Sequence, residues 1–252
     1  MSRATSGPSQ TRSSGPRPRA FVTTHWSIVL AAGQSNSTHA QAALSKLCQT
    51  YWYPLYAYVR QRGYSSHDSQ DLTQDFFARL LEKNTLCVVT REKGRFRSFL
   101  LTALSHFLAD EWRKEHAQKR GGGQILTLDL NAAETRFGLE PTETTTPEKV
   151  FEQNWALALL NTVFERLRDE YHTDGKSNLF EALKFCLTGE RSSVPYAELA
   201  VQLKLPENTV KVAVHRLRRR SRELLREEVS HTVDRSGEVE EELQYLFRVL
   251  AT

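Results

Sequence analysis

The stretch VPYAELAVQLKLPENTVKVAVHRLRRRSRELLRE, residues 194–227, decides the fold of the second half of this chain. Its apolar residues recur three and four positions apart on both sides of a short interruption, Lys204-Leu205-Pro206. This spacing predicts two amphipathic helices joined by a tight turn. The first stripe comprises Tyr196, Leu199, Ala200 and Leu203, and the second comprises Val210, Ala213, Val214, Leu217, Leu224 and Leu225.

Three residues indicate that this pair is a helix-turn-helix. Ala200 is small enough to let two steeply crossing helices approach closely. Leu205 is expected to plug the corner between them, and Pro206 suits the first position of the second helix, where its missing N–H costs nothing.

The second helix is strongly basic on one side. From Lys211 to Arg226 it carries seven basic residues against Glu223 alone. A basic helix by itself is more often a solvated surface. Here the charge is one-sided and follows a helix-turn-helix pattern, which favours a helix docked in a DNA major groove and flanked by phosphates.

Composition narrows the class of protein. The chain has 252 residues, of which 39% are apolar, and this is enough for helical cores in one large or two small domains. Without an apolar run of about 20 residues or the apolar core of a signal peptide, the expected compartment is the cytoplasm. The cysteines Cys48, Cys87 and Cys186 are far apart and form no CxxC pair, so neither a disulfide framework nor a zinc site is predicted.

Helical spacing continues along most of the chain, and no convincing strand pattern occurs, so the predicted fold is all-α. Pro54 is expected to kink or break the second helix. A start at 146–147 is predicted from a Thr cap followed by Pro. The expected helices cover 23–33, 37–62, 66–83, 95–119, 147–171, 178–187 and 237–250, besides the pair in 194–227.

Composition also divides the chain. Residues 1–19 form a basic tail that is expected to be disordered. Two small helical domains, 20–120 and 147–230, are expected to be joined by a flexible, acidic, mostly extended linker at 121–146. An acidic amphipathic extension, 231–252, ends the sequence, and its apolar face is formed by Val239, Leu243, Leu246, Phe247 and Leu250.

The helix at 95–119 places aromatic rings among cations. Such a pattern suits single-stranded nucleic acid, which is held by stacking and phosphate attraction. Taken alone, it is more often a core stripe. The predicted stripe is Phe96, Phe99, Leu100, Ala103, Leu104, Phe107, Leu108 and Trp112.

The order of these pieces resembles the extracytoplasmic-function (ECF) group of bacterial sigma factors, in the sigma-70 family. The resemblance rests on DLTQDFF at 71–77, GRFRSFLLTALSHFLADEWRKEHAQKR at 94–120, the acidic linker, and NTVKVAVHRLRRRSRELL at 208–225. It implies a detachable initiation subunit of RNA polymerase with two DNA-reading domains. The implied partners are core RNA polymerase and promoter DNA, and no cofactor, metal or catalytic residue is implied.

The resemblance also implies three contact surfaces. The first docks on the clamp of the polymerase, and Asp71, Gln74 and Asp75 are expected to be exposed there, because they point away from the apolar stripe of their helix. The docking residues are Asp71, Leu72, Gln74, Asp75 and Phe76. The residues for the minus-ten element are Arg95, Arg97, His106, Asp110, Arg113 and Lys114. Those for the minus-thirty-five element are Asn208, Thr209, Lys211, Val212, His215, Arg216, Arg218, Arg219 and Arg222.

This chain departs from the family pattern at two positions. His106 stands where many relatives carry Asn, and Lys204 replaces the glycine usual in the turn, which predicts a slightly strained turn. The leading segment TTHWSIVLAAG at 23–33 and the extension at 227–252, with its tail VEEELQYLFRVLAT, resemble a subgroup for which regulation by protein kinases is suspected. An anti-sigma factor or a protein kinase is therefore a candidate regulator.

Two other functions compete with this interpretation. A stand-alone helix-turn-helix regulator that senses a ligand or phosphoryl group would need a receiver-like β/α pattern or an apolar pocket, and neither is visible in the sequence. An enzyme is not expected, because the sequence has no Gly-rich phosphate loop, HExxH motif or nucleophile elbow. The acidic pairs Asp110-Glu111 and Asp71/Asp75 are interpreted as surface charge rather than metal ligands. Tethered acidic segments are also expected to mask the basic helices of the isolated factor.

Overall fold

A computed structural model describes residues 38–81, 95–117, 133, 135–137, 145–187, 195–233 and 236–251. Within these ranges all regular structure is helical, which confirms the all-α prediction. The predicted tail at 1–19 and helix at 23–33 lie outside the described residues. No described helix is both long enough and apolar enough to cross a membrane.

Three helices make up the first half of the described chain. They are α2 (Thr38–Gln61), α3 (Ser66–Leu81) and α4 (Phe96–Ala117). Pro54 lies inside α2 without ending it, so the predicted break does not occur. Pro54 is itself buried among the aromatic residues of α2, and packing on the rest of the protein outweighs the lost backbone hydrogen bond.

The second half begins with a long helix, α6 (Pro147–Thr173). Its start follows the predicted chemistry, because the Thr146 side chain accepts a hydrogen bond from the backbone N–H of Lys149 at 3.3 Å. The chain continues through α7 (Ser177–Leu183), the short 3-10 helix η2 (Lys184–Cys186), α8 (Tyr196–Leu203) and α9 (Glu207–Ser230). A further 3-10 turn, η3 (Ser236–Glu238), leads into α10 (Val239–Leu250).

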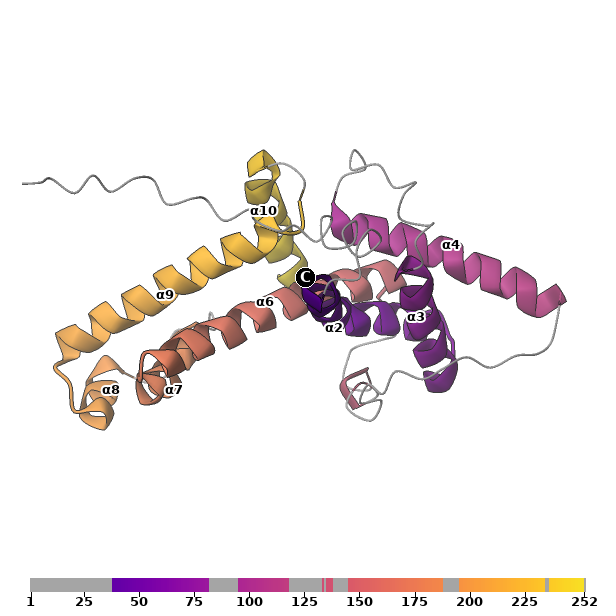
Figure 1. The fold of residues 1–252 in the computed structure, drawn as a ribbon. Helices are drawn as coiled ribbons and strands as arrows, with labels where there is room; N and C mark the ends of the chain where they lie inside the picture. The colour runs from indigo at the N-terminus through magenta and orange to yellow at the C-terminus, as the bar shows by residue number, and fades with distance from the viewer. Residues whose placement is uncertain are drawn as a thin grey trace, which may run out of the picture.

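The helices form an elongated molecule (Figure 1). Helices α2, α6 and α10 meet near its middle, while α3 and most of α4 lie toward one end. The α7–α8 region and the start of α9 lie at the other end, and α6 runs alongside α9. The predicted surfaces on α4 and α9 therefore extend in opposite directions from a common centre.

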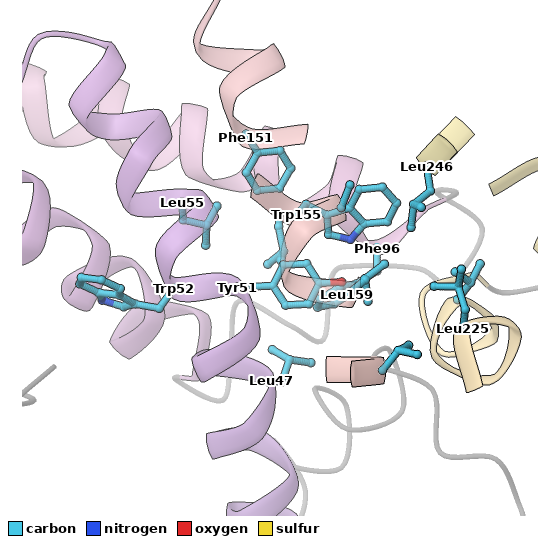
Figure 2. Close-up of a cluster of buried hydrophobic side chains, with 14 of the residues drawn as sticks. Leu47, Tyr51, Trp52, Leu55, Phe96, Phe151, Trp155, Leu159, Leu225 and Leu246 are labelled. Atoms are coloured by element: carbon cyan, nitrogen blue, oxygen red, sulfur yellow. The ribbon is translucent and has the colours of Figure 1, made fainter. Parts of the chain in front are cut away.

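One buried cluster joins these helices (Figure 2). At its centre the Tyr51 ring of α2 meets the Phe96 ring of α4 edge to face, with centroids 5.4 Å apart, and Trp155 of α6 is fully buried beside them. Leu225 of α9 and Leu246 of α10 close the cluster from the other side. The division into two domains stays a prediction, since helices from both sides share this cluster.

The predicted linker, 121–146, is not simply extended where the structure describes it. Residues 133 and 135–137 are helical, and Ala133 is buried. Arg136, the only Lys or Arg residue in 121–146, donates a hydrogen bond to Asn154 at 2.7 Å, and its guanidinium lies 3.9 Å from the centroid of the Tyr53 ring. A cation placed over an aromatic face gains electrostatic attraction, which holds this segment against α2 and α6.

Two expected core residues are exposed. Trp112 is 54% exposed and belongs to the last turns of α4 by its position in Phe96–Ala117. One end of α4 extends past α3 (Figure 1). Leu205 is 37% exposed and so does not plug the corner between α8 and α9. Leu199 of α8 is buried and belongs to the common cluster.

Candidate nucleic-acid interface

The turn between α8 and α9 contains the strained Lys204 that the sequence predicted. Lys204 caps α8 in the left-handed region, at φ 54° and ψ 41°, where a side chain is strained and glycine is favoured. The Leu205 N–H donates to the Ala200 carbonyl at 3.0 Å and ties the turn to α8. Pro206 precedes α9 as its cap residue, one position earlier than predicted, and suits that place because it needs no N–H partner.

Helix α9 separates an apolar face from a polar one. Its buried side chains include Val210, Val214, Leu217 and Leu224, which recur at helical spacing against α6 and α8. All the residues predicted to face the minus-thirty-five element are exposed. These are Asn208, Thr209, Lys211, Val212, His215, Arg216, Arg218, Arg219 and Arg222.

Two of these exposed basic residues form weak ion pairs with acids of α9 itself. Lys211 pairs with Glu207 at 2.7 Å and Arg219 with Glu223 at 2.9 Å, each one helical turn apart and open to solvent. Such exposed pairs contribute about 0.3–0.5 kcal/mol, so phosphate can replace the acid readily. Arg218 is more constrained, because its Nε donates to the Cys186 carbonyl at 2.9 Å.

Arg220, one of the seven predicted basic residues, has a structural role instead. Its guanidinium donates two hydrogen bonds to Glu170 of α6, at 2.6 and 2.8 Å. The hydrogen bonds from Arg220 lower the pKa of Glu170. This pair binds α9 to α6 and leaves the opposite face of α9 open.

A second ion-pair group joins the same two helices. Arg166 of α6 donates to Glu228 at 2.5 Å and to Glu227 at 2.8 Å. Burial by itself raises the pKa of Glu228, but hydrogen bonds from His231 and Arg166 outweigh burial and hold that pKa at about 2. Together with Arg220, this group fixes the orientation of α9.

The far half of α4 carries four of the predicted minus-ten residues on its surface. His106, Asp110, Arg113 and Lys114 are all exposed. Arg113 pairs with Asp110 at 2.9 Å, and Lys114 pairs with Glu111 at 3.0 Å. His106 and Asp110 also line a groove of about 580 Å³ between α3 and α4, whose apolar wall includes Phe99 and Phe107.

The start of α4 differs from this prediction. Arg97 is only 4% exposed, and its Nε donates to Glu242 of α10 at 2.8 Å. Its Nη1 donates to Glu152 of α6 at 3.1 Å. Arg95 is half-buried and its Nε lies 2.7 Å from the other oxygen of Glu242. In this structure α10 and α6 therefore cover Arg97, and its assignment to the minus-ten surface stays a prediction.

Aromatic rings complete the surroundings of Arg97. Its guanidinium lies 3.9 Å from the centroid of Tyr245 and 5.0 Å from that of Trp155. Burial alone would lower the pKa of Arg97, but the hydrogen bond and charge of Glu242 raise it, so the guanidinium stays charged. Sequence reasoning missed Glu242, although a signal was present. It lies three residues after Val239 and four before Leu246, an acid within an apolar stripe.

The predicted docking residues on α3 divide into two groups. Asp71 and Asp75 are exposed and Leu72 is half-buried. Gln74, expected on the exposed face, is only 7% exposed, and Phe76 is buried against Phe107 with ring centroids 5.8 Å apart. Helix α3 contacts both α2 and α4, so its buried arc is wider than a single stripe and includes Gln74.

The described residues contain no group of three His, Cys, Asp or Glu side chains that could hold a metal ion. Cys186 is buried and Cys48 is half-buried, and both are free thiols. Burial raises the pKa of the Cys48 thiol to about 11, which keeps it protonated and unreactive.

Comparison with known proteins adds one finding. A family model described as "ECF sigma factor" matches residues 34–228, which include α2 to α9 except the last residues of α9. No curated protein and no solved structure gives a match. The matched region holds α3, α4 and the α8–α9 pair, and it ends before α10. The chain therefore belongs to the ECF sigma factor family, and its role is that of a sigma factor in transcription initiation, with core RNA polymerase and promoter DNA as the partners that this family implies.

Proposed function

We propose that the protein binds core RNA polymerase through α3 and directs promoter recognition and opening through α9 and α4. The observation that carries this proposal is the exposure of every predicted minus-thirty-five residue on α9 while the apolar stripe of α9 is buried. A helix held to its domain along one face has the opposite face available for a major groove.

The exposed face of α9 combines groups that read bases with groups that hold phosphates. Asn208, Lys211 and Arg216 lie in its first half, where amide, ammonium and guanidinium groups can contact base edges in the major groove. Arg219 and Arg222 lie further along and suit phosphate contacts, which position the helix on any sequence.

The groove between α3 and α4 suits one unstacked base. Phe99 and Phe107 provide apolar and aromatic surface, and His106 and Asp110 provide hydrogen-bonding groups. A base taken out of the helix is held by stacking and by polar contacts to its edge. Arg113 and Lys114 continue along the exposed side of α4 and can hold the neighbouring phosphates.

The acidic surface of α3 suits a cationic partner. Partial burial, followed by the charges of Asp71 and Glu111, raises the pKa of Asp75. These carboxylates repel one another in the free protein. A basic surface on core RNA polymerase would relieve that repulsion. The negative charge of α3 would also steer such a surface toward this helix.

Reconstituted transcription tests the proposal. The purified chain is mixed with core RNA polymerase, co-purified by size exclusion, and supplied with a library of genomic fragments for run-off transcription. The expected result is a stable complex and discrete transcripts that core alone does not make. Binding of promoter fragments without any binding to core would support a stand-alone regulator instead.

A further inference from the structure

We propose that α10 is an internal competitor for the start of α4: its Glu242 occupies Arg95 and Arg97 in the free protein, and promoter DNA must displace it. The inference rests on the proposed function, because it assumes that these arginines belong to the minus-ten surface. It adds an autoinhibitory contact made by α10, a helix that lies outside the matched family region of 34–228.

Both arginines bind the same buried carboxylate. Glu242 is 0% exposed, with one oxygen 2.7 Å from Arg95 Nε and the other 2.8 Å from Arg97 Nε. The Arg95 guanidinium also lies 3.6 Å from Glu241. Helix α10 thus brings two carboxylates, together with the Tyr245 ring, to the first turn of α4.

The backbone strengthens this docking. The Phe96 N–H, at the start of α4, donates to the carbonyl of Thr232 at 3.1 Å. Thr232 is fully buried in the turn that follows α9. The start of α4 is therefore fixed against the segment that leads from α9 to α10.

Docking of α10 and binding of DNA by Arg97 exclude each other. A guanidinium recognises carboxylate and phosphate with the same forked donors. In this structure the donors of Arg97 face Glu242 and Glu152, and the guanidinium lies near two aromatic rings. A phosphate can reach it only after Glu242 has moved away.

The composition of α10 makes such a movement feasible. Only three of its apolar side chains are buried, Val239, Leu243 and Leu246, whereas Phe247 is exposed. Glu242 occupies a position on the buried face where an apolar residue would dock at least as tightly, because a buried ion pair must offset the cost of removing both charges from water. The ion pair thus specifies the docking site without making the docking irreversible.

A matched pair of variants tests the competition. Glu242→Gln removes the charge that faces Arg95 and Arg97, while Glu240→Gln removes an equal charge from the same turn of α10. Glu240 pairs with Arg226 of α9 at 3.0 Å on the surface. The probe is a fluorescent single-stranded 20-nucleotide DNA, titrated without core at fixed low salt and read by anisotropy.

We expect Glu242→Gln to bind the probe about tenfold more tightly than the wild type, because apparent affinity rises with the fraction of protein in the competent state. Glu240→Gln should stay within about twofold of wild type, since its exposed pair contributes little. Amide hydrogen exchange in 239–250 should speed up in Glu242→Gln while α2 and α6 stay protected, which shows that the fold is intact.

Tyr245→Leu gives a second route that leaves no unpaired buried charge. It removes the ring over Arg97 and should shift probe affinity in the same direction, by about threefold. Equal probe affinity of the wild type, Glu242→Gln and Tyr245→Leu, with faster exchange in α10, would overturn the inference and leave α10 as packing only.

The two proposals fail separately. If the full chain initiates transcription with core but Glu242→Gln gains no DNA affinity, the competition is refuted and the proposed function stands. If the full chain never initiates with core, the proposed function is refuted, whatever the oligonucleotide shows. An absence of probe binding by every variant also counts against the competition, since there is then no binding for α10 to limit.

Discussion

The two arginine-rich surfaces of this protein have opposite surroundings. On α9, Arg216, Arg219 and Arg222 are exposed. Arg219 pairs with Glu223 of its own helix, and the Arg222 Nε donates to the Arg218 carbonyl at 3.2 Å. At the start of α4, Arg97 is enclosed by a carboxylate of α10, a carboxylate of α6 and two aromatic rings. In the sequence both surfaces have the same appearance, arginines beside an apolar stripe.

The comparison shows that the acids brought by the fold decide which arginines are available. Glu242 is 145 residues away from Arg97 along the chain, so no local pattern pairs them. The acids that pair with Lys211 and Arg219 on the exposed face of α9 belong to α9 itself, one turn away, and they remain in solvent. Masking by the acidic extension was expected on both basic surfaces, but the buried contacts of α10 with arginine are at α4.

The largest expected difference between the two arginine-rich surfaces is in how much an arginine contributes to the free energy of unfolding. Arg97→Ala leaves Glu242 buried with half of its partners, and breaking a buried pair costs about 3–5 kcal/mol. Arg216→Ala, on the exposed face of α9, should stay within about 0.5 kcal/mol. Urea denaturation with a shared slope measures both, as the shift in the midpoint.

A double variant sharpens this contrast. Replacing both partners, as Arg97→Met with Glu242→Leu, removes both charges and keeps the volume, so most of the lost stability should return. A double variant as unstable as Arg97→Ala would show that packing around Arg97, rather than its charge, accounts for the effect.

The pH dependence of stability compares the side of α9 that is ion-paired to α6 with the side that is exposed to solvent. Because the Glu228 pKa is held at about 2, well below the ordinary 4.5, this carboxylate contributes about 3 kcal/mol at neutral pH. The sign follows from a depressed pKa: the contribution is complete above about pH 4.5 and is lost as the pH falls toward 2.

The matched variants are Glu228→Gln and Glu223→Gln. Glu228→Gln should be less stable at neutral pH and should flatten the fall in stability between pH 4.5 and 2. Glu223→Gln should change the profile much less: Arg219 and Arg220 also lower the pKa of Glu223, but this carboxylate is exposed and its pairs are screened by solvent. An unchanged profile in Glu228→Gln would mean that other carboxylates cause the acid sensitivity.

On the exposed surface of α9, substitutions of base-contacting residues and of phosphate-contacting residues should have different effects on DNA binding. Arg216→Ala should cost about 1–3 kcal/mol on the preferred minus-thirty-five sequence and relax the preference at one position. Arg222→Ala should weaken all sequences alike and reduce the salt slope by about one. Selection from a promoter library, repeated at two salt concentrations, distinguishes them. Recovery of the wild-type motif at full strength with Arg216→Ala would contradict the assignment.

The smallest expected effect is on α3. Asp71→Lys with Asp75→Lys should weaken binding to core by about 1–2 kcal/mol, since exposed charges contribute up to about 1 kcal/mol each. Gln74→Ala should instead lower stability without a specific effect on core binding, because Gln74 is buried. Competition with labelled wild-type factor measures the affinity of each variant for core RNA polymerase. The helicity of each variant, measured by circular dichroism, controls for folding. Unaltered core binding by the double variant would remove Asp71 and Asp75 from the interface.

Local patterns predicted most of the helices to within a few residues. The Thr146 cap and Pro147 place the start of α6, and the spacing of Val210, Val214 and Leu217 identifies the buried face of α9. Such features depend on residues within one or two turns, which is the range over which caps and periodicity act. The same reasoning failed for two residues. Gln74 is buried because both α2 and α4 pack on α3, and Trp112 is exposed in the last turns of α4.

The sequence by itself determined an all-α chain, the α8–α9 pair with its strained Lys204 turn, and which face of α9 is polar. It contained both arginine-rich surfaces but did not distinguish them. Only the tertiary structure decided that Arg97 is covered and Arg216 is open, because a buried charge is tolerated only beside a partner. For Arg97 that partner, Glu242, comes from a helix at the other end of the chain.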